Sequence, residues 1–314
     1  MPECRPLAPT KHVGNRPIVI GRLLIGALAT AALSCWSCAP TTLQPSHSLP
    51  WHLMAIGVAD AWKVTQGEGE VIAILDSGLT DGALPKLRER EVGPRPQSDT
   101  NGHGTAVTSL AAGSGDLEVF GVAPRARVLA IAVIDASGQI STEAVVDAIY
   151  SAVRQGASVI NMSFGRTSDS PPIRSAIDYA SGRGVVIVAA GGDTASPGSM
   201  FPANIAGEVI AVRALTQKGE PPLSANGVGT NGIDAPGENL PAVRLRNGAV
   251  GQVGMNGSSM ATAVVSGSVA LLEACAHRQP GRVLSQAAIV RALRDSERPG
   301  PWFNLRSSLH SIGC

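Results

Sequence analysis

The sequence predicts an α/β fold: a doubly wound, mostly parallel sheet with helices on both faces. Four short apolar runs, each long enough for one buried strand, are separated by segments with helical periodicity. Alternation of this kind is typical of parallel sheets. Of the 314 residues, 44% are hydrophobic and 16% are charged, which allows a sizeable buried core.

The expected strands are residues 71–75, 128–134, 158–162 and 185–190. Between the second and third of these, residues 142–155 have apolar side chains at helical spacing and are followed by Gly156, a helix-stop signal. Residues 285–296 predict a short amphipathic helix with Ser285 as its N-cap. Residues 51–314 are therefore expected to form one doubly wound domain.

The first 35 residues have the layout of an export signal. A basic lead precedes the apolar residues 23–33, a run too short to span a bilayer comfortably. Residues 32–35 (ALSC) resemble a bacterial lipobox, which implies a lipid on Cys35 and attachment to a membrane. The alternatives are an ordinary cleaved signal with free secretion, and a short anchor helix. Residues 36–50 are rich in Pro, Ser and Thr and predict a tether.

The net charge and the cysteine content limit the kinds of partner and the cellular compartment that can be expected for this chain. The net charge is +1 and no basic stripe is present, so a nucleic-acid partner has no electrostatic support. Cys275 and Cys314 are candidates for a disulfide between a core helix and the C-terminus. Two unpaired thiols are the alternative, because spacing does not settle connectivity.

Three polar segments flanked by glycine carry the candidate chemistry. Asp76 follows a predicted strand, His103 precedes an Ala-rich helical pattern, and Ser259 opens an apolar helix that continues to about Cys275. Taken singly, these residues are ordinary turn and cap residues. Together they supply a nucleophile, a base to accept its proton and a carboxylate to orient that base. A zinc protease is disfavoured, because the chain has no H-E-x-x-H motif.

The segments around these residues resemble the three signature segments of the subtilases, a family of serine peptidases. They are residues 71–78 (VIAILDSG), 101–105 (NGHGT) and 257–262 (GSSMAT). Further matches in the expected order include 121–124 (GVAP), 159–165 (VINMSFG) and 234–237 (DAPG). The resemblance covers residues 51–314 and implies a subtilisin-like fold, with Asp76, His103 and Ser259 as the triad of a serine endopeptidase acting on proteins or peptides.

The resemblance also implies an oxyanion hole and a specificity pocket. Asp193 stands where the family usually has Asn as the oxyanion-hole residue, and we expect Asp193, the backbone N–H of Ser259 and Asn256 to surround the oxyanion. An ionised Asp193 only accepts hydrogen bonds, whereas a protonated one can donate. The pocket edges are expected at residues 163–165 and 190–192, and Met200 is expected near the pocket floor. By residue these are Ser163, Phe164, Gly165, Ala190, Gly191, Gly192 and Met200.

Other departures from the family bear on metal binding and activity. The family's best-known calcium site draws on an Asp where this chain has Lys86, in residues 84–87 (LPKL), so we expect no calcium there. We also expect no cofactor. Only residues 36–50 stand where many subtilases carry a long propeptide. Together with Asp193, this motivates an alternative function: a catalytically weak or inactive peptide-binding protein of the cell envelope.

Overall fold

A computed structural model describes residues 48–87, 90–92, 99–229, 232–296 and 300–314. The expected export signal, residues 1–35 with Cys35, lies outside the described residues, as do residues 36–47 of the expected tether. The described residues all belong to one compact unit.

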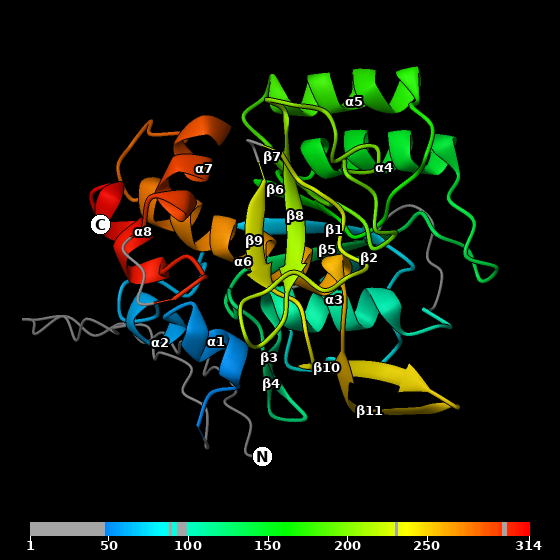
Figure 1. The fold of residues 1–314 in the computed structure, drawn as a ribbon, viewed down its shortest axis with the longest axis horizontal. Helices are drawn as coiled ribbons and strands as arrows, with labels where there is room; N and C mark the ends of the chain where they lie inside the picture. The colour runs from blue at the N-terminus through cyan, green and yellow to red at the C-terminus, as the bar shows by residue number, and fades with distance from the viewer. Residues whose placement is uncertain (1–47, 88–89, 93–98, 230–231, 297–299) are drawn as a thin grey trace, which may run out of the picture. The chain divides into compact units, whose positions relative to one another are not determined.

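A seven-stranded parallel sheet forms the centre of this unit, in the order β2-β5-β1-β6-β7-β8-β9 (Figure 1). The strands are β1 (Val71–Asp76), β2 (Arg90–Val92), β5 (Arg127–Ala132), β6 (Val159–Met162), β7 (Val186–Ala190), β8 (Val209–Leu215) and β9 (Ile233–Pro236). All four expected strands are present as β1, β5, β6 and β7. The second is shorter than expected, because after Ala132 the N–H groups of Val133 and Ile134 both turn to the backbone oxygen of Asp76.

Helices cover both faces of the sheet, as the fold class predicted. Ile72 and Ile74 of β1 pack in the core under α3 (His103–Ala112) and α6 (Ser258–Ala276). Ala73 and Leu75 point the other way, into the core under α4 (Thr142–Arg154) and α5 (Pro171–Ser181). The predicted helix 142–155 is confirmed as α4, whose N-cap Ser141 accepts a hydrogen bond from the N–H of Ala144.

Helix α6 is the most buried helix of the fold. By length and composition it is apolar enough to cross a membrane, but 94% of its most apolar window is buried inside the protein. A helix that is apolar on all sides and enclosed by protein is a core helix. Helix α6 packs against β6, β7, β8 and β9, and the hydrogen bonds between Ser259 and Ser163 hold its N-terminus where β6 ends.

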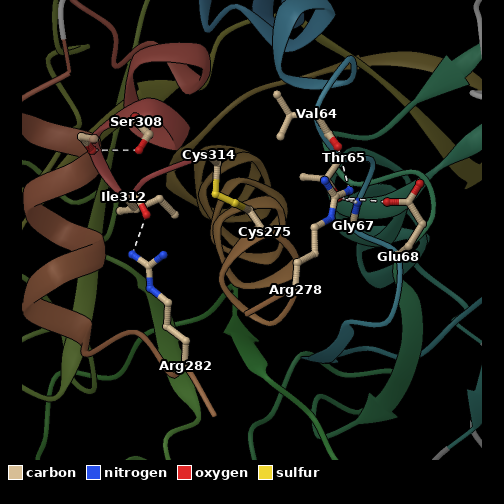
Figure 2. Close-up of a disulfide and its surroundings, with 11 residues drawn as sticks. Val64, Thr65, Gly67, Glu68, Cys275, Arg278, Arg282, Ser308, Ile312 and Cys314 are labelled. Carbon is tan, nitrogen blue, oxygen red and sulfur yellow. Dashed lines mark hydrogen bonds between the residues drawn. A yellow bond between two sulfur atoms is a disulfide. The ribbon is translucent and has the colours of Figure 1, made fainter. Parts of the chain in front are cut away.

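The C-terminal segment closes the core at the other end of α6. It contains α7 (Gln286–Arg294), capped by Ser285 as predicted, and α8 (Leu305–Ser311). A disulfide joins Cys275 of α6 to Cys314, so the cysteines are paired and are not free thiols (Figure 2). Two short N-terminal helices, α1 (Trp51–Ala55) and α2 (Val58–Ala61), contribute to the same core.

Two hairpins complete the described structure: β3 (Ser114–Asp116) with β4 (Val119–Phe120), and β10 (Leu240–Arg246) with β11 (Ala249–Met255). The β10–β11 hairpin packs against α3, where the N–H of Val243 donates to the hydroxyl of Ser109 at 3.0 Å. From the same strand, Arg244 donates through Nε to the backbone oxygen of Asn101 at 3.1 Å. The hairpin thus holds the segment that leads into α3.

Candidate active site

The candidate residues gather at the carboxyl edge of the sheet, where open α/β sheets bind their ligands. Asp76 is the last residue of β1, and its neighbour Leu75 is paired with Met162 of β6. Ser163 therefore leaves β6 at the level of Asp76. Met162 is in turn paired with Ala189 of β7, so the segment after Ala190 starts at the same edge.

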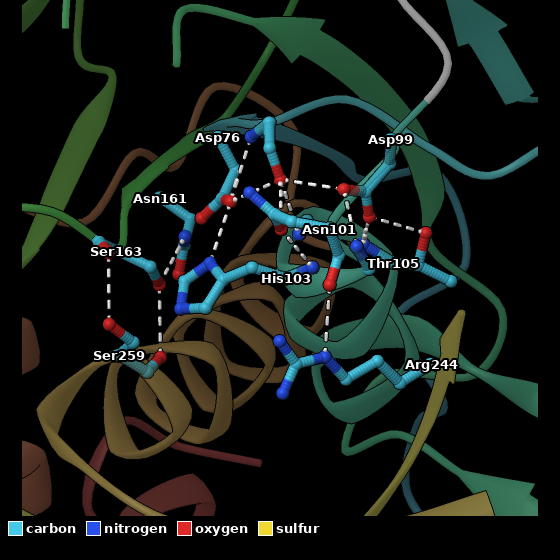
Figure 3. A network of polar contacts seen from close by, with 12 residues as sticks. Asp76, Asp99, Asn101, His103, Thr105, Asn161, Ser163, Arg244 and Ser259 are labelled. Atoms are coloured by element: carbon cyan, nitrogen blue, oxygen red, sulfur yellow. Dashed lines mark hydrogen bonds and ion pairs between the residues drawn. The ribbon is translucent and has the colours of Figure 1, made fainter. Parts of the chain in front are cut away.

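Asp76 and His103 are in direct contact. Oδ1 of Asp76 lies 2.7 Å from Nδ1 of His103 and also accepts the N–H of Ser77 at 2.8 Å (Figure 3). The Asp76 side chain is fully buried, whereas 27% of the His103 side chain is exposed. A buried carboxylate on Nδ1 leaves Nε2 of the imidazole as the nitrogen that faces the site.

Two glycines make this contact possible. Gly102, the residue before α3, has a φ of +76°, and a Cβ on it would lie 2.6 Å from the backbone oxygen of Leu245. A Cβ on Gly104 would lie 2.3 Å from the backbone oxygen of Gly78. The first turn of α3 therefore packs backbone against backbone on the segment that follows β1, which brings His103 within reach of Asp76.

The charges around His103 favour its protonated form. Burial is the largest single influence and lowers the pKa of His103, but the charge and hydrogen bond of Asp76, together with the charge of Asp99, outweigh it, so that the net pKa lies above its usual value. Asp99 raises the pKa of His103 further, and Arg244 lowers it. Such an imidazole is suited to accept a proton and to be stabilised as an imidazolium by its carboxylate partner.

Ser259 is the second residue of α6 and is tied to Ser163. The hydroxyl of Ser259 donates to the backbone oxygen of Ser163 at 2.9 Å, and the hydroxyl of Ser163 donates to the backbone oxygen of Ser259 at 2.9 Å. Asn161 supports this pair by donating through Nδ2 to the Ser163 hydroxyl at 2.9 Å. Within the described residues Ser259 makes no hydrogen bond to His103, although Figure 3 draws the imidazole between Asp76 and the Ser259 end of α6.

Asp193 lies at the N-terminus of α6 and accepts hydrogen bonds there. Its Oδ2 accepts the N–H of Ser258 at 3.0 Å and the Ser258 hydroxyl at 2.7 Å. The partial positive charge of a helix N-terminus stabilises a carboxylate in this place. Asn256 lines the same pocket as Asp193, and its Oδ1 accepts the N–H of Asn239 at 2.7 Å. Asp193 and Asn256 therefore lie near the N-terminus of α6, and the side-chain oxygen of each accepts hydrogen bonds.

Met200 packs against both segments that are expected to form the pocket edges, residues 163–165 and 190–192. A Cβ on Gly165 would lie 2.8 Å from Cβ of Met200, and one on Gly192 would lie 2.9 Å from its Cγ and Sδ. The N–H of Met200 donates to the backbone oxygen of Gly191 at 2.9 Å. Phe164 is buried in the core beneath α4 and α5, which leaves its backbone at the edge. Met200 thus occupies the space between the glycine-lined edges.

One buried residue that shapes this region has no signal in the sequence. Asn226 is 1% exposed; its Oδ1 accepts the N–H groups of Thr194 and Ser196 at 2.9 and 3.0 Å, and its Nδ2 donates to the backbone oxygen of Gly191 at 3.1 Å. It therefore holds the loop that carries Asp193. Asn226 lies in a segment without periodicity, 35 residues from Gly191, so only the folded chain reveals its role.

Comparisons with known proteins identify the family and relatives of this chain. A sequence profile of the Subtilase family matches residues 67–305. The chain is 34% identical over 235 residues to a thermostable alkaline protease of Halalkalibacterium halodurans, covering 73% of this chain and 63% of that protein. It is 33% identical over 236 residues to Subtilisin Savinase of Lederbergia lenta, covering 73% and 85% respectively. The chain therefore spans less than two thirds of the first of these relatives.

Two solved structures that resemble this chain are also proteases. The Prenylagaramide maturation protease PagA superposes with a TM-score of 0.70 at 28% identity, covering 82% of this chain and 98% of that one. A point mutant of the protease domain of PatA superposes with a TM-score of 0.68 at 26% identity, covering 79% and 96%. Both matches extend over nearly the whole of the solved chains.

Proposed function

Because this chain belongs to the subtilase family, we propose that it is a serine endopeptidase that uses Asp76, His103 and Ser259. The observation that carries the proposal is the 2.7 Å contact between the buried Asp76 and His103, at the sheet edge where Ser259 begins α6. A carboxylate, an imidazole and a serine are the three groups that acyl transfer to serine requires.

The reaction begins with a rotation of the Ser259 side chain. Its Oγ turns from the Ser163 oxygen to Nε2 of His103, which removes the hydroxyl proton as Oγ attacks the scissile carbonyl. His103 then gives that proton to the leaving amine, and an acyl-enzyme remains on Ser259. Water then gives a proton to His103 as its oxygen attacks the acyl carbonyl, the ester bond to Ser259 Oγ breaks, and His103 returns the proton to Oγ as the carboxylic acid leaves. Asp76 keeps the imidazole oriented and stabilises the imidazolium.

The oxyanion forms near the N-terminus of α6. We infer that the backbone N–H of Ser259, Asp193 and Asn256 surround it, as the family resemblance implies. An ionised Asp193 repels the oxyanion, so Asp193 contributes a hydrogen bond only when it carries a proton. In subtilisin, loss of one oxyanion-hole donor costs about 10² to 10³ in turnover, which weakens catalysis without abolishing it.

The substrate is an extended peptide with a small or medium apolar residue before the cleaved bond. Residues 163–165 and 190–192 follow or end the neighbouring strands β6 and β7 at the carboxyl end of the sheet, and we infer that backbone groups there pair with an extended peptide as an added strand. The position of Met200 between Gly165 and Gly192 supports the size limit, because its side chain fills space that a large substrate side chain would need.

A peptide-binding protein with weak or no catalysis is the second candidate function. It is favoured by the acceptor role of Asp193 and by the Ser259 hydroxyl, which faces Ser163. Labelling with a fluorophosphonate separates the two candidates, because the reagent requires an activated serine. Labelling of the wild type that is lost in Ser259→Ala supports the peptidase; a folded wild type that stays unlabelled at every pH supports the binding protein.

We further propose that the protein is exported and works in the cell envelope or outside the cell. The basic lead, the apolar residues 23–33 and Cys35 support this location. A lipidated Cys35 would carry several acyl chains, which suffice for stable anchoring. Fractionation of cells that express the wild type or Cys35→Ala tests the anchor: loss of the variant from membranes supports lipidation, and equal partitioning rejects it. A wild type that stays in the cytoplasm rejects export.

A further inference from the structure

We propose that Asp99 is a positioning residue for His103: its buried carboxylate holds the segment that carries the imidazole against Asp76. This inference rests on the proposed function, because it concerns the same imidazole. It adds a second carboxylate to the site, one that touches neither Ser259 nor the pocket edges and that lies four residues before His103 in the chain.

Asp99 is fully buried and accepts hydrogen bonds on both oxygens. Its Oδ1 accepts the Ser77 hydroxyl at 2.8 Å and the Gly102 N–H at 2.9 Å. Its Oδ2 accepts the Thr105 N–H at 2.8 Å and the Thr105 hydroxyl at 2.7 Å. A buried carboxylate is tolerated when it is satisfied in this way, and hydrogen bonds to a charged acceptor are stronger than neutral ones.

These four donors connect the two halves of the Asp76–His103 pair (Figure 3). Ser77 follows Asp76 and donates its own N–H to Oδ1 of Asp76 at 2.8 Å. Gly102 and Thr105 lie on the two sides of His103 in the chain. Asp99 therefore binds the end of β1 and the start of α3 at once, and a shift of either end changes the Asp76–His103 distance.

Asp99 also serves as the cap of α3. The N-cap residue of this helix is Gly102, which has no side chain to accept the first free N–H groups. Oδ2 of Asp99 accepts the N–H of Thr105 instead, in the first turn of the helix. A negative charge at a helix N-terminus is favourable, so the same carboxylate stabilises α3 and fixes its first residue, His103.

The charges that act on His103 come from three elements. They are Asp76 at the end of β1, Asp99 before α3 and Arg244 on β10. Asp99 raises the pKa of His103 and Arg244 lowers it. Loss of the Asp99 charge should therefore lower the pKa of His103, whereas a purely structural role of Asp99 would affect stability and leave this pKa in place.

The test is an NMR titration of the His103 imidazole in a Ser259→Ala background, which prevents self-digestion. Asp99→Asn should lower the titration midpoint by roughly half a pH unit to one unit. The matched control is Asp116→Asn, because Asp116 is also buried and accepts a backbone N–H, that of Lys86 at 3.0 Å, but lies beyond the opposite end of α3. The control should leave the midpoint unchanged.

Kinetics of the same substitutions with Ser259 intact supply the second measurement. Asp99→Asn should lower kcat/KM by about 10- to 100-fold, since misplacement of a catalytic group by a fraction of an ångström is costly. The acid limb of its pH profile should move to lower pH. An unchanged His103 midpoint in folded Asp99→Asn, or an equal shift in Asp116→Asn, overturns the proposal.

Ser77→Ala keeps the test decisive if Asp99→Asn does not fold. This substitution removes a hydroxyl that donates to Asp99 at 2.8 Å, lies 3.2 Å from Oδ1 of Asp76 and accepts the Gly104 N–H, but it keeps every charge. It should lower kcat with little change in KM, and a kcat equal to that of the wild type overturns the proposal. An inactive wild type would instead refute the proposed function, and the NMR titration would still decide whether Asp99 acts on His103.

Discussion

The hydroxyl of Ser259 donates to the backbone oxygen of Ser163 at 2.9 Å, and the hydroxyl of Ser163 donates back to the oxygen of Ser259 at 2.9 Å. This reciprocal pair joins the first turn of α6 to the end of β6. A rotation about the Cα–Cβ bond of Ser259 breaks only the first of the two bonds. The backbone thus stays in place while Oγ turns to His103, at a cost of about 0.5–1.5 kcal/mol.

Replacement of the two neighbouring serines should have unequal effects on turnover. Ser259→Ala should lower kcat by about 10⁴- to 10⁶-fold, because the nucleophile is lost. Ser258→Ala removes only a hydroxyl bound to Asp193 and should keep kcat within about tenfold of the wild type. Hydrolysis of a chromogenic peptide measures both, and circular dichroism checks the fold. A larger loss in Ser258→Ala would mean that the nucleophile is misassigned.

Asp193→Asn should raise turnover at alkaline pH. The amide supplies a donor that an ionised carboxylate lacks, and one such donor is worth about 10² in kcat. The helix cap is kept, since the amide oxygen can still accept from Ser258. A variant that is equally active or weaker across the whole pH range counts against this account of the oxyanion hole.

The sequence predicted the central strands and the edge at which the site lies. Each of β1, β5, β6 and β7 is a nearly continuous apolar run, and such runs are diagnostic because these strands are buried on both faces. The outer strands were not predicted. Arg213 interrupts β8, and its guanidinium is paired with Asp234 of β9 at 2.8 Å, so the two charges are satisfied across the strands. A pattern of apolar residues does not reveal such a pair.

The sequence predicts those residues of the candidate site that lie in distinctive segments. It does not predict the contacts between residues that are far apart in the chain. Asp76, His103 and Ser259 are flanked by glycines and lie at predicted element boundaries. Asn226 has no such context, and Asp99 connects the segment around His103 to Ser77, which lies 22 residues away in the chain. The direction of the Ser259 hydroxyl depends on Ser163, which is 96 residues distant. Such relationships exist only in the folded chain.

Met200→Gly should widen the specificity pocket. Removal of the side chain between Gly165 and Gly192 opens space for larger residues before the cleaved bond. The ratio of kcat/KM for Phe over Ala at that position should rise by about tenfold or more. A peptide library with the wild type and the variant measures this ratio. A wild type that already prefers Phe, Tyr or basic residues would contradict the assignment of Met200 to the pocket.

His52 should limit stability in acid. Its side chain is fully buried, neither ring nitrogen has a hydrogen-bond partner within the described structure, and burial lowers its pKa to about 3. In the unfolded chain His52 therefore binds a proton near pH 6.5, whereas in the folded chain it stays neutral at that pH. The free energy of unfolding consequently falls as the pH drops below 6.5. At pH 5 this loss amounts to about 2 kcal/mol.

Substitution of His52 by an apolar residue should remove that loss. His52→Leu should unfold in acid at a lower pH than the wild type, and its free energy of unfolding should depend less on pH between about pH 7 and 5. Urea unfolding at several pH values measures both quantities. The control is His310→Gln, because His310 is exposed on α8 and should leave the pH dependence as it is. The same slope in His52→Leu as in the wild type would show that another group controls unfolding in acid.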